Sequence, residues 1–270
     1  MALAKVEFVT RKRGASLEDF EWEVEFYLSG LQSNGQIERD YLIEYKGRRI
    51  VAICQLAKLK FSLPRHCSAF GKTRLKKLLT DFETVPEWSL IETGCCNDVD
   101  WRKAPFLFLN TSVFQTVSPV TVPGPNLMTI ATVILPINEL TRERVKCWAR
   151  EYQDLQAVWM NSGHLEGRAY KEIADPNSEF SEQGRDLART LEKELKKPFY
   201  YFLPRSHGRR DESGRVCPGC GRKWRIKAAE AEKLGDYITF KCASCRLVSE
   251  DASSRDPRFA KYGEYRPKKS

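Results

Sequence analysis

Two cysteine pairs near the C-terminus constrain the fold of this 270-residue chain more than any other feature. Cys217-Pro-Gly-Cys220 and Cys242-Ala-Ser-Cys245 are CxxC motifs separated by 21 residues, a spacing typical of zinc ribbons. Each motif can present two thiolates to one ion, and the intervening residues can fold back as a hairpin that brings the pairs together. Four thiolates around zinc leave no open position, so we predict a structural Zn²⁺ and not a reaction centre.

The alternative for these cysteines is a redox pair, which the repetition of the motif at ribbon spacing disfavours. Gly221 follows the first motif and allows the backbone to turn so that amides point at the thiolate sulfurs. Trp224 and Ile226 are expected to pack beneath this turn, and Phe240 to lie on the second strand of the ribbon.

Positive charge is concentrated on the same segment. Residues 205–270 contain 17 Lys and Arg against 9 Asp and Glu, a net charge of +8, whereas residues 1–204 contain 28 against 27. A local basic excess is the electrostatic footprint of a nucleic-acid-binding protein, and cations interleaved with an aromatic ring suit single strands or RNA. The alternatives are a solubilising surface and, for Trp224, a place in the core of the ribbon. The candidate nucleic-acid-binding residues are Arg209, Arg210, Arg215, Arg222, Lys223, Trp224, Arg225, Lys227, Lys241 and Arg246.

The rest of the chain predicts an α+β protein, with a mixed N-terminal α/β domain, a helical segment and the small zinc ribbon. A helix is expected to begin after Ser16, with Asp19 as its capping partner, because apolar residues recur at helical spacing from there to residue 31. Further helices are expected at 70–79, 145–173 with a break at Ser162-Gly163, and 187–195. Strands are expected at 6–10, 88–93, 105–109, 128–135 and 198–204, with a hairpin across 37–56.

These elements suggest four parts. Residues 1–140 form an α+β domain, and residues 141–204 form a helical segment that packs on it and ends in a strand. Residues 205–250 form the four-cysteine zinc ribbon, and residues 251–270 form a basic tail. The chain contains neither a signal-peptide pattern nor an apolar stretch of spanning length, so we expect a cytoplasmic protein.

The sequence offers little for catalysis. It lacks a Walker phosphate loop, a GxSxG elbow and an HExxH pair, so we expect no enzyme activity and name no catalytic residue. If the protein were an enzyme, His66, Cys67, Cys95 and Cys96 would be the candidates. The same four residues could form a second metal site, although free structural thiols are the commoner case. Cys54 and Cys147 are expected in the core.

Several segments of the second half resemble a known family. They include Leu155-Gln-Ala-Val-Trp-Met-Asn-Ser-Gly163, Asp175-Pro-Asn-Ser178, Pro198-Phe-Tyr-Tyr201, Cys217-Pro-Gly-Cys-Gly221 and Phe240-Lys-Cys-Ala-Ser-Cys-Arg-Leu-Val-Ser249. Over about residues 150–250 the chain is similar to a bacterial family of unknown function, described as zinc-ribbon-containing proteins with a suggested nucleic-acid-binding role. The resemblance implies the zinc ribbon and brings no enzyme activity.

Two functions remain open from the sequence. The first is a non-enzymatic zinc-ribbon protein that binds nucleic acid, with RNA as one candidate, through the basic C-terminal module. The second is a protein-binding immunity protein that neutralises a bacterial toxin, in which the larger domain forms the interface and the ribbon is purely structural. The sequence leaves the oligomeric state open.

Overall fold

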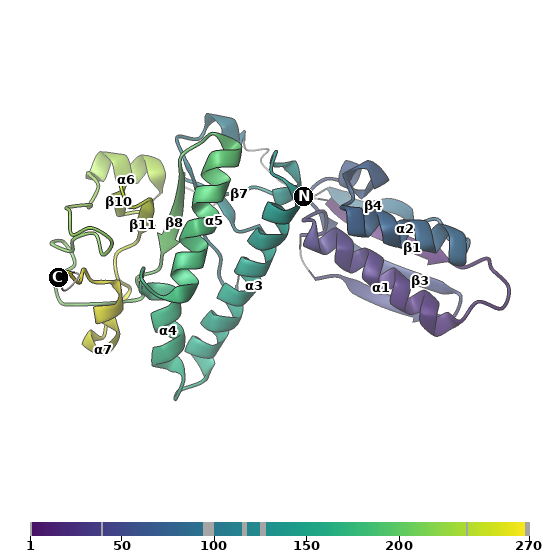
Figure 1. Ribbon diagram of the computed structural model, residues 1–270, viewed down its shortest axis with the longest axis horizontal. Helices are drawn as coiled ribbons and strands as arrows, with labels where there is room; N and C mark the ends of the chain where they lie inside the picture. The colour runs from purple at the N-terminus through teal and green to yellow at the C-terminus, as the bar shows by residue number, and fades with distance from the viewer. Residues whose placement is uncertain are drawn as a thin grey trace. The chain divides into compact units, whose positions relative to one another are not determined.

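A computed structural model of the chain describes residues 2–38, 40–93, 100–114, 118–124, 128–235 and 237–267 (Figure 1). It contains helices and sheets, which confirms the α+β class. The described residues divide into two compact units: 2–93, 118 and 131–146 form the first, and 100–114, 119–124, 128–130 and 147–267 form the second. The domain boundaries expected at residues 140, 204 and 250 stay predictions.

The first unit is a four-stranded antiparallel sheet with two helices. Its elements follow the order β1 (Ala2–Val9), α1 (Leu17–Ser33), β2 (Leu42–Lys46), β3 (Arg49–Leu56), α2 (Ala69–Asp81) and β4 (Glu87–Thr93). The strands lie in the order β2-β3-β1-β4 and each pairs antiparallel with its neighbours. This βαββαβ order is the ferredoxin-like arrangement.

The local signals for the first unit are confirmed. Ser16 caps α1, because its hydroxyl accepts a hydrogen bond from the Asp19 amide at 3.2 Å. The β2–β3 hairpin turns at Gly47, whose φ of +60° is one that glycine adopts without strain. Strand β1 alternates, so Val6 and Phe8 lie in the core together with Cys54 of β3.

The second unit is built on a six-stranded sheet in the order β10-β11-β8-β5-β6-β7. The strands are β5 (Leu107–Leu109), β6 (Val120–Val122), β7 (Met128–Thr129), β8 (Phe199–Leu203), β10 (Phe240–Cys242) and β11 (Leu247–Ser249). Strand β8 pairs in parallel with β5 on one side and with β11 on the other. The two strands of the cysteine-rich module are therefore part of the same sheet as the segments that precede it.

Strand β8 is buried on both faces, as central parallel strands are. Tyr201 meets the ring of Trp148, 5.9 Å away between centroids, on the side of the helices. Tyr200 and Phe202 face the other way and join a cluster with Leu234. The helices of this unit are α3 (Glu139–Asn161), whose first residues belong to the first unit, α4 (Glu166–Ala174), α5 (Glu179–Leu195), α6 (Ala228–Leu234) and α7 (Pro257–Ala260).

The last residues of the described chain are packed against the second unit. Strand β12 (Ser254–Arg255) pairs in parallel with β9 (His207–Gly208), and α7 follows directly. Phe259 on α7 is 8% exposed and contacts the ring of Tyr170 on α4. The segment predicted as a basic tail is thus ordered structure as far as residue 267.

Two local predictions were wrong. The strand expected over 128–135 is limited to Met128–Thr129 and gives way to a 3-10 turn at Thr132–Ile134, since a run of β-branched residues does not by itself supply a pairing partner. Cys147 is exposed and not in the core, because Trp148 beside it occupies the buried face of α3. The expected break after α3 is confirmed, since the helix ends at Asn161.

No helix in the described part of the chain combines the length and the hydrophobicity that crossing a membrane would need.

One buried carboxyl group of the first unit has a hydrogen bond to only one of its two oxygens. Glu38 is 5% exposed, and its Oε2 accepts a hydrogen bond from the Ser118 amide at 3.0 Å. Its Oε1 has no hydrogen-bond partner among the described residues. Burial raises the pKa of this carboxyl, although Lys146 and the Ser118 amide oppose the shift.

We predict that Glu38→Gln stabilises the protein at pH 7 by about 1 kcal/mol, because an amide keeps the acceptor for Ser118 without a buried charge. The raised pKa means that the stability contributed by neutral Glu38 is fully present below the carboxyl's ordinary pKa. It is lost as the pH rises through the raised value. Urea denaturation at several pH values should show this decline in the wild type and a flatter profile in the variant. Glu23→Gln, which weakens the contact with Arg74 at 3.4 Å, should not stabilise.

Candidate metal centre

The two CxxC motifs come together in the second unit. Cys217 and Cys220 lie on a turn, Cys242 ends β10, and Cys245 lies on the turn before β11. One ligand atom from each cysteine lies within 4.8 Å of the other three, and the Sγ atoms of Cys220 and Cys242 are 3.6 Å apart. All four are free thiols. The predicted ligand set is therefore assembled as one cluster that could hold a metal ion.

The geometry fits a tetrahedral ion with sulfur ligands. A metal–sulfur distance of about 2.3 Å implies sulfur–sulfur edges of about 3.8 Å, close to the separation of Cys220 and Cys242. Cys217 and Cys242 are buried, and Cys220 and Cys245 are partly exposed. The cluster is thus at the edge of the module, where an ion can enter and is then enclosed on two sides.

The first turn directs backbone amides at sulfur, as Gly221 led us to expect. Gly221 has a φ of +73°, a conformation that favours glycine. The amides of Gly219 and Cys220 donate hydrogen bonds to the thiol of Cys217. Burial opposes ionisation of Cys220, but hydrogen bonds from the Arg222 amide and from neighbouring thiols lower the pKa of Cys220 to about 7. Such amide bonds stabilise thiolates and orient metal ligands.

Trp224 and Phe240 form the core of the module. Trp224 is 3% exposed, its ring lies 5.1 Å from that of Phe240, and its indole nitrogen donates to the Arg215 carbonyl at 3.0 Å. The guanidinium of Arg215 covers both rings, at 4.9 Å from Trp224 and 4.2 Å from Phe240. This arrangement places Trp224 in the ribbon core, the alternative that the sequence had left open for it.

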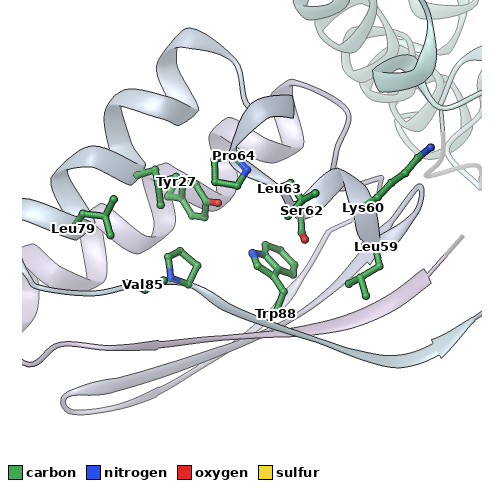
Figure 2. A pocket seen from close by; sticks show the side chains of 11 residues that line it. Tyr27, Leu59, Lys60, Ser62, Leu63, Pro64, Leu79, Val85 and Trp88 are labelled. Carbon is green, nitrogen blue, oxygen red and sulfur yellow. The ribbon is translucent and has the colours of Figure 1, made fainter.

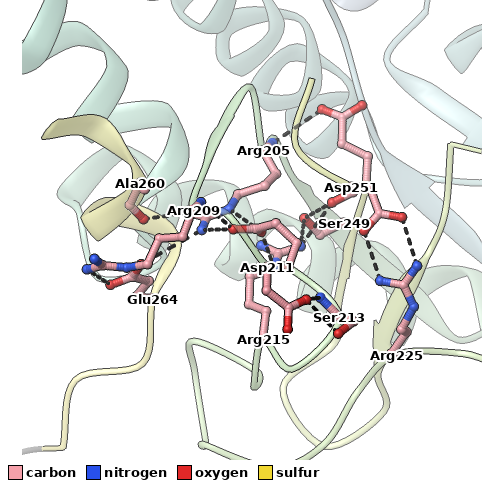
Figure 3. Close-up of polar contacts among 12 residues, drawn as sticks. Arg205, Arg209, Asp211, Ser213, Arg215, Arg225, Ser249, Asp251, Ala260 and Glu264 are labelled. Atoms are coloured by element: carbon pink, nitrogen blue, oxygen red, sulfur yellow. Dashed lines mark hydrogen bonds and ion pairs between the residues drawn. The ribbon is translucent and has the colours of Figure 1, made fainter. Parts of the chain in front are cut away.

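Five of the nine cations predicted to contact nucleic acid are held by carboxylates within this unit. The carboxylates orient these side chains and neutralise part of their charge. Figure 3 shows the pairs of Arg209 with Glu264 and of Arg225 with Asp251. The pairs are Arg209 with Glu264, Arg215 with Glu212, Arg225 with Asp251, Lys241 with Glu230, and Arg246 with Glu192.

The other four predicted cations are exposed. They are Arg210, Arg222, Lys223 and Lys227, and no carboxylate of the described residues lies within ion-pair distance of them. Arg222 and Lys223 directly follow the first cysteine turn, and Lys227 immediately precedes α6. Of the nine predicted cations, those without an ion pair in the described chain therefore lie mainly beside the first cysteine turn.

Sequence reasoning missed a buried arginine at the base of the module. Arg205 is 1% exposed and makes a two-pronged ion pair with Glu212, with both N–O distances at 2.9 Å. It also donates to the carbonyl of Ala260, just before the last turn of the chain. Burial and the charge of Arg205 lower the pKa of the neighbouring Arg215 to about 10. These contacts join segments up to 55 residues apart, so no local pattern could have revealed them.

His207 and the catalytic candidate Cys67 both lie among packed side chains. His207 packs against the rings of Trp159, Tyr170 and Phe259, and its Nδ1 lies 2.7 Å from the Ser254 hydroxyl. Cys67 is buried, which raises the pKa of its thiol, and it accepts a hydrogen bond from Gln36 at 3.8 Å.

His66, beside Cys67, is in edge contact with the ring of Phe61 at 5.0 Å, and His164 is exposed. Cys95 and Cys96, and with them the possibility of a second metal site, lie outside the described residues.

Two family models match the part of the chain that forms most of the second unit. Residues 102–204 match the family model of a domain of unknown function, DUF2310, and residues 207–254 match that of a second one, DUF8594. Two uncharacterized proteins of Haemophilus influenzae are each 37% identical over 145 residues, which is 52% of this chain. The match covers 53% of the first relative and 68% of the second. The chain belongs to the same family as these proteins.

The expected kinship with a bacterial family of unknown function is thus confirmed, and it extends further towards the N-terminus than the resemblance over 150–250. The chain spans about half the length of the first relative. The names of the two matched domains mention neither a zinc ribbon nor nucleic acid. In this chain the two matched segments share one sheet, because β8 belongs to the first segment and its partner β11 to the second.

We predict that Gly219→Ala weakens metal binding roughly tenfold, since an added methyl carbon would lie 2.9 Å from Cys245 Sγ. Competition between the protein and a chromophoric chelator for added Zn²⁺ measures the effect. Gly214→Ala is the matched control, because nothing lies within 4 Å of a methyl carbon there. Equal affinities in the two variants would show that the close approach at Gly219 does not shape the site.

Proposed function

We propose that this chain is a non-enzymatic binding protein whose C-terminal module is held by one structural Zn²⁺ and contacts nucleic acid. Four thiolates with no oxygen or nitrogen ligand favour zinc over magnesium or calcium, and a full set of four leaves no position for a reacting water. The cluster of four sulfurs within 4.8 Å supports the metal, and it supports a structural role more than a catalytic one.

The observation that carries the nucleic-acid proposal is the division of the module's cations. Arg205 and the five paired residues make ion pairs within the second unit, although Arg209 and Arg225 stay exposed. Arg210, Arg222, Lys223 and Lys227 are exposed and have no carboxylate of the described residues within ion-pair distance. Exposed cations on a metal-stabilised turn are suited to phosphate oxygens, which need charge and not a shaped pocket. Because Trp224 is buried, we assign the binding energy to backbone contacts and not to base stacking.

Contacts with phosphates determine how steeply the affinity falls with salt. Each phosphate neutralised on a single strand contributes about −0.7 to the slope of log K against log salt, so four contacts imply a slope of about −3. Binding of this kind is weak at physiological salt, and it depends little on the nucleotide sequence.

The double substitution Arg222→Ala and Lys223→Ala should weaken binding of a fluorescent RNA of about 30 nucleotides at least tenfold at low salt and reduce the salt slope by about half. Fluorescence anisotropy at increasing salt measures both quantities. A control that replaces Lys171 of α4 and Lys193 of α5 by Ala removes the same charge elsewhere on the second unit and should change affinity little. Failure of the wild type to bind RNA or single-stranded DNA at micromolar concentration in low salt would refute the proposal.

Removal of the metal should unfold the module, because the binding free energy of a structural zinc is folding free energy. After treatment with a strong chelator, hydrogen–deuterium exchange should rise across residues 207–254, and RNA binding should be lost. Strands β10 and β11 form an edge of the second sheet, so we expect faster exchange in β8 as well. Continued protection of β10 and β11 in protein shown by elemental analysis to be metal-free would contradict a structural role.

A second candidate function, binding of a protein such as a toxin, is favoured by one feature of the first unit. Trp22 and Phe26 on α1 are 54% and 41% exposed, and Phe70 on α2 is 45% exposed. The guanidinium of Arg74 lies over Phe26 at 5.1 Å and over Phe70 at 4.7 Å. Trp and Arg dominate the energetic centres of protein interfaces. A chain that fails to bind nucleic acid but co-purifies with the product of a neighbouring toxin gene would have this function.

A further inference from the structure

The first unit contains a cavity that neither proposed function uses. It has a volume of about 580 Å³ and lies between the two helices, the turns that precede α2, and the start of β4 (Figure 2). Its volume falls in the range of small-molecule sites, which is about 300–1,000 Å³. Lining residues come from α1, α2, the 3-10 turns Leu59–Ser62 and Pro64–His66, and the segment that enters β4.

The walls of the cavity are largely apolar. Leu59, Leu63, Leu75, Leu79 and Val85 supply aliphatic surface, and Trp88 supplies the face of an indole. Leu63, Leu79 and Val85 remain 42%, 44% and 63% exposed, so the described part of the chain leaves the mouth of the cavity uncovered. An apolar ligand would remove this surface from water, which is favourable by about 25 cal/mol for each Å² buried.

Polar groups gather at one part of the cavity. The Tyr27 hydroxyl, on a side chain that is 1% exposed, is engaged with the Cys67 thiol and the Trp88 indole. Ser62 is 7% exposed and lines the cavity, and no hydrogen-bond partner for its hydroxyl is found among the described residues. Lys60 lines the same end, and its ammonium contacts the ring of Phe61 at 5.3 Å with no carboxylate of the described chain in ion-pair range.

The charge of residues 57–80, the segment that supplies seven of the eleven lining residues, is one-sided. Residues 57–80 contain seven Lys and Arg and no Asp or Glu, and none of the lining residues is acidic. Glu23 of α1 pairs with Arg74 and Lys77 and so offsets two of the seven, whereas the cations of the two 3-10 turns have no such partner in the described chain. The positive charge also affects His66, because burial and the charges of Arg65 and Lys60 lower the pKa of its imidazole.

We propose that this cavity binds a small amphipathic carboxylate, with its aliphatic chain between Leu79, Val85 and Trp88 and its carboxylate at Ser62 and Lys60. The Lys60 side chain starts at the same end as the Ser62 hydroxyl and extends away from the cavity in Figure 2. Rotation of this flexible side chain would bring its ammonium to a carboxylate held at Ser62, so the end of the apolar interior can complement such a molecule. The seven cations disfavour a cationic amphiphile, and a neutral one would leave the Lys60 charge without a partner. The inference is independent of the nucleic-acid proposal, since it concerns the other unit.

The experiment is isothermal titration calorimetry of the full chain with decanoate as the probe. Decanoate should bind, decanol should bind at least fivefold more weakly, and acetate should not bind, because both the chain and the charge contribute. Lys60→Ala should weaken decanoate binding about fivefold, the effect expected of one partly exposed ion pair. Ser62→Ala should weaken it by a smaller factor.

Two filling variants test the location. Leu79→Trp and Val85→Trp place an indole at the mouth of the cavity and should abolish binding, and both positions are exposed enough to accept the larger side chain. Leu42→Trp, at a 73% exposed position on edge strand β2, is the control and should bind as the wild type does. Circular dichroism establishes that each variant is folded.

Three results would overturn the proposal. The first is no heat of binding with decanoate at millimolar concentration. The second is equal affinity for decanol and decanoate, which would reduce the cavity to a non-specific apolar surface. The third is a change in oligomeric state of Leu79→Trp or Val85→Trp by light scattering, which would show that a second copy of the chain covers the cavity.

Discussion

The parallel pairing of β8 with β11 is the contact on which the second unit depends. It makes the edge of the cysteine-rich module a continuation of the sheet that carries α3, α4 and α5. Tyr201 packs towards the helices while Tyr200 packs towards α6, so one short strand supplies both hydrophobic clusters. The cysteine cluster, the module and the helices are therefore joined through one sheet. A zinc ribbon on a flexible tether would add affinity for a ligand but would not transmit the loss of its metal to the rest of the unit.

Because the module shares a sheet with the rest of the second unit, some of its cations make ion pairs within that unit. Joining the module to the helices requires specific contacts across the junction, and Arg246 provides one by pairing with Glu192 of α5 at 2.7 Å. Arg205 makes a different contact, which joins Glu212 to Ala260 at the end of α7. Buried ion pairs of this kind need full hydrogen bonding to offset desolvation, and Arg205 has it. Several cations of residues 205–270 thus take part in contacts within the second unit.

The sequence predicts those features that local chemistry determines. The four-cysteine cluster follows from CxxC geometry, the start of α1 from Ser16 and Asp19, and the apolar stripe of α3 from residues that recur every three or four positions. Features that depend on distant partners were not predictable: the order of the six strands, the buried Arg205, and the short β7 where a full strand was expected. Cys147 shows the same limit within a helix, because a rotation of one residue separates it from the buried Trp148.

Of the two candidate sites, the metal site lies in the segments that the two family models match, and the cavity lies before them. The matches to DUF2310 and DUF8594 begin at residue 102, after the whole βαββαβ segment that contains the cavity. A ligand of the cavity would therefore be a property of the first unit and could differ between proteins that share the metal module. Conversely, Arg222 and Lys223 belong to the matched region. The proposed nucleic-acid binding can therefore be tested in relatives that have the four cysteines. Each site can accordingly be tested with variants that leave the other unit unaltered, and loss of one binding activity alone would show that the units act separately.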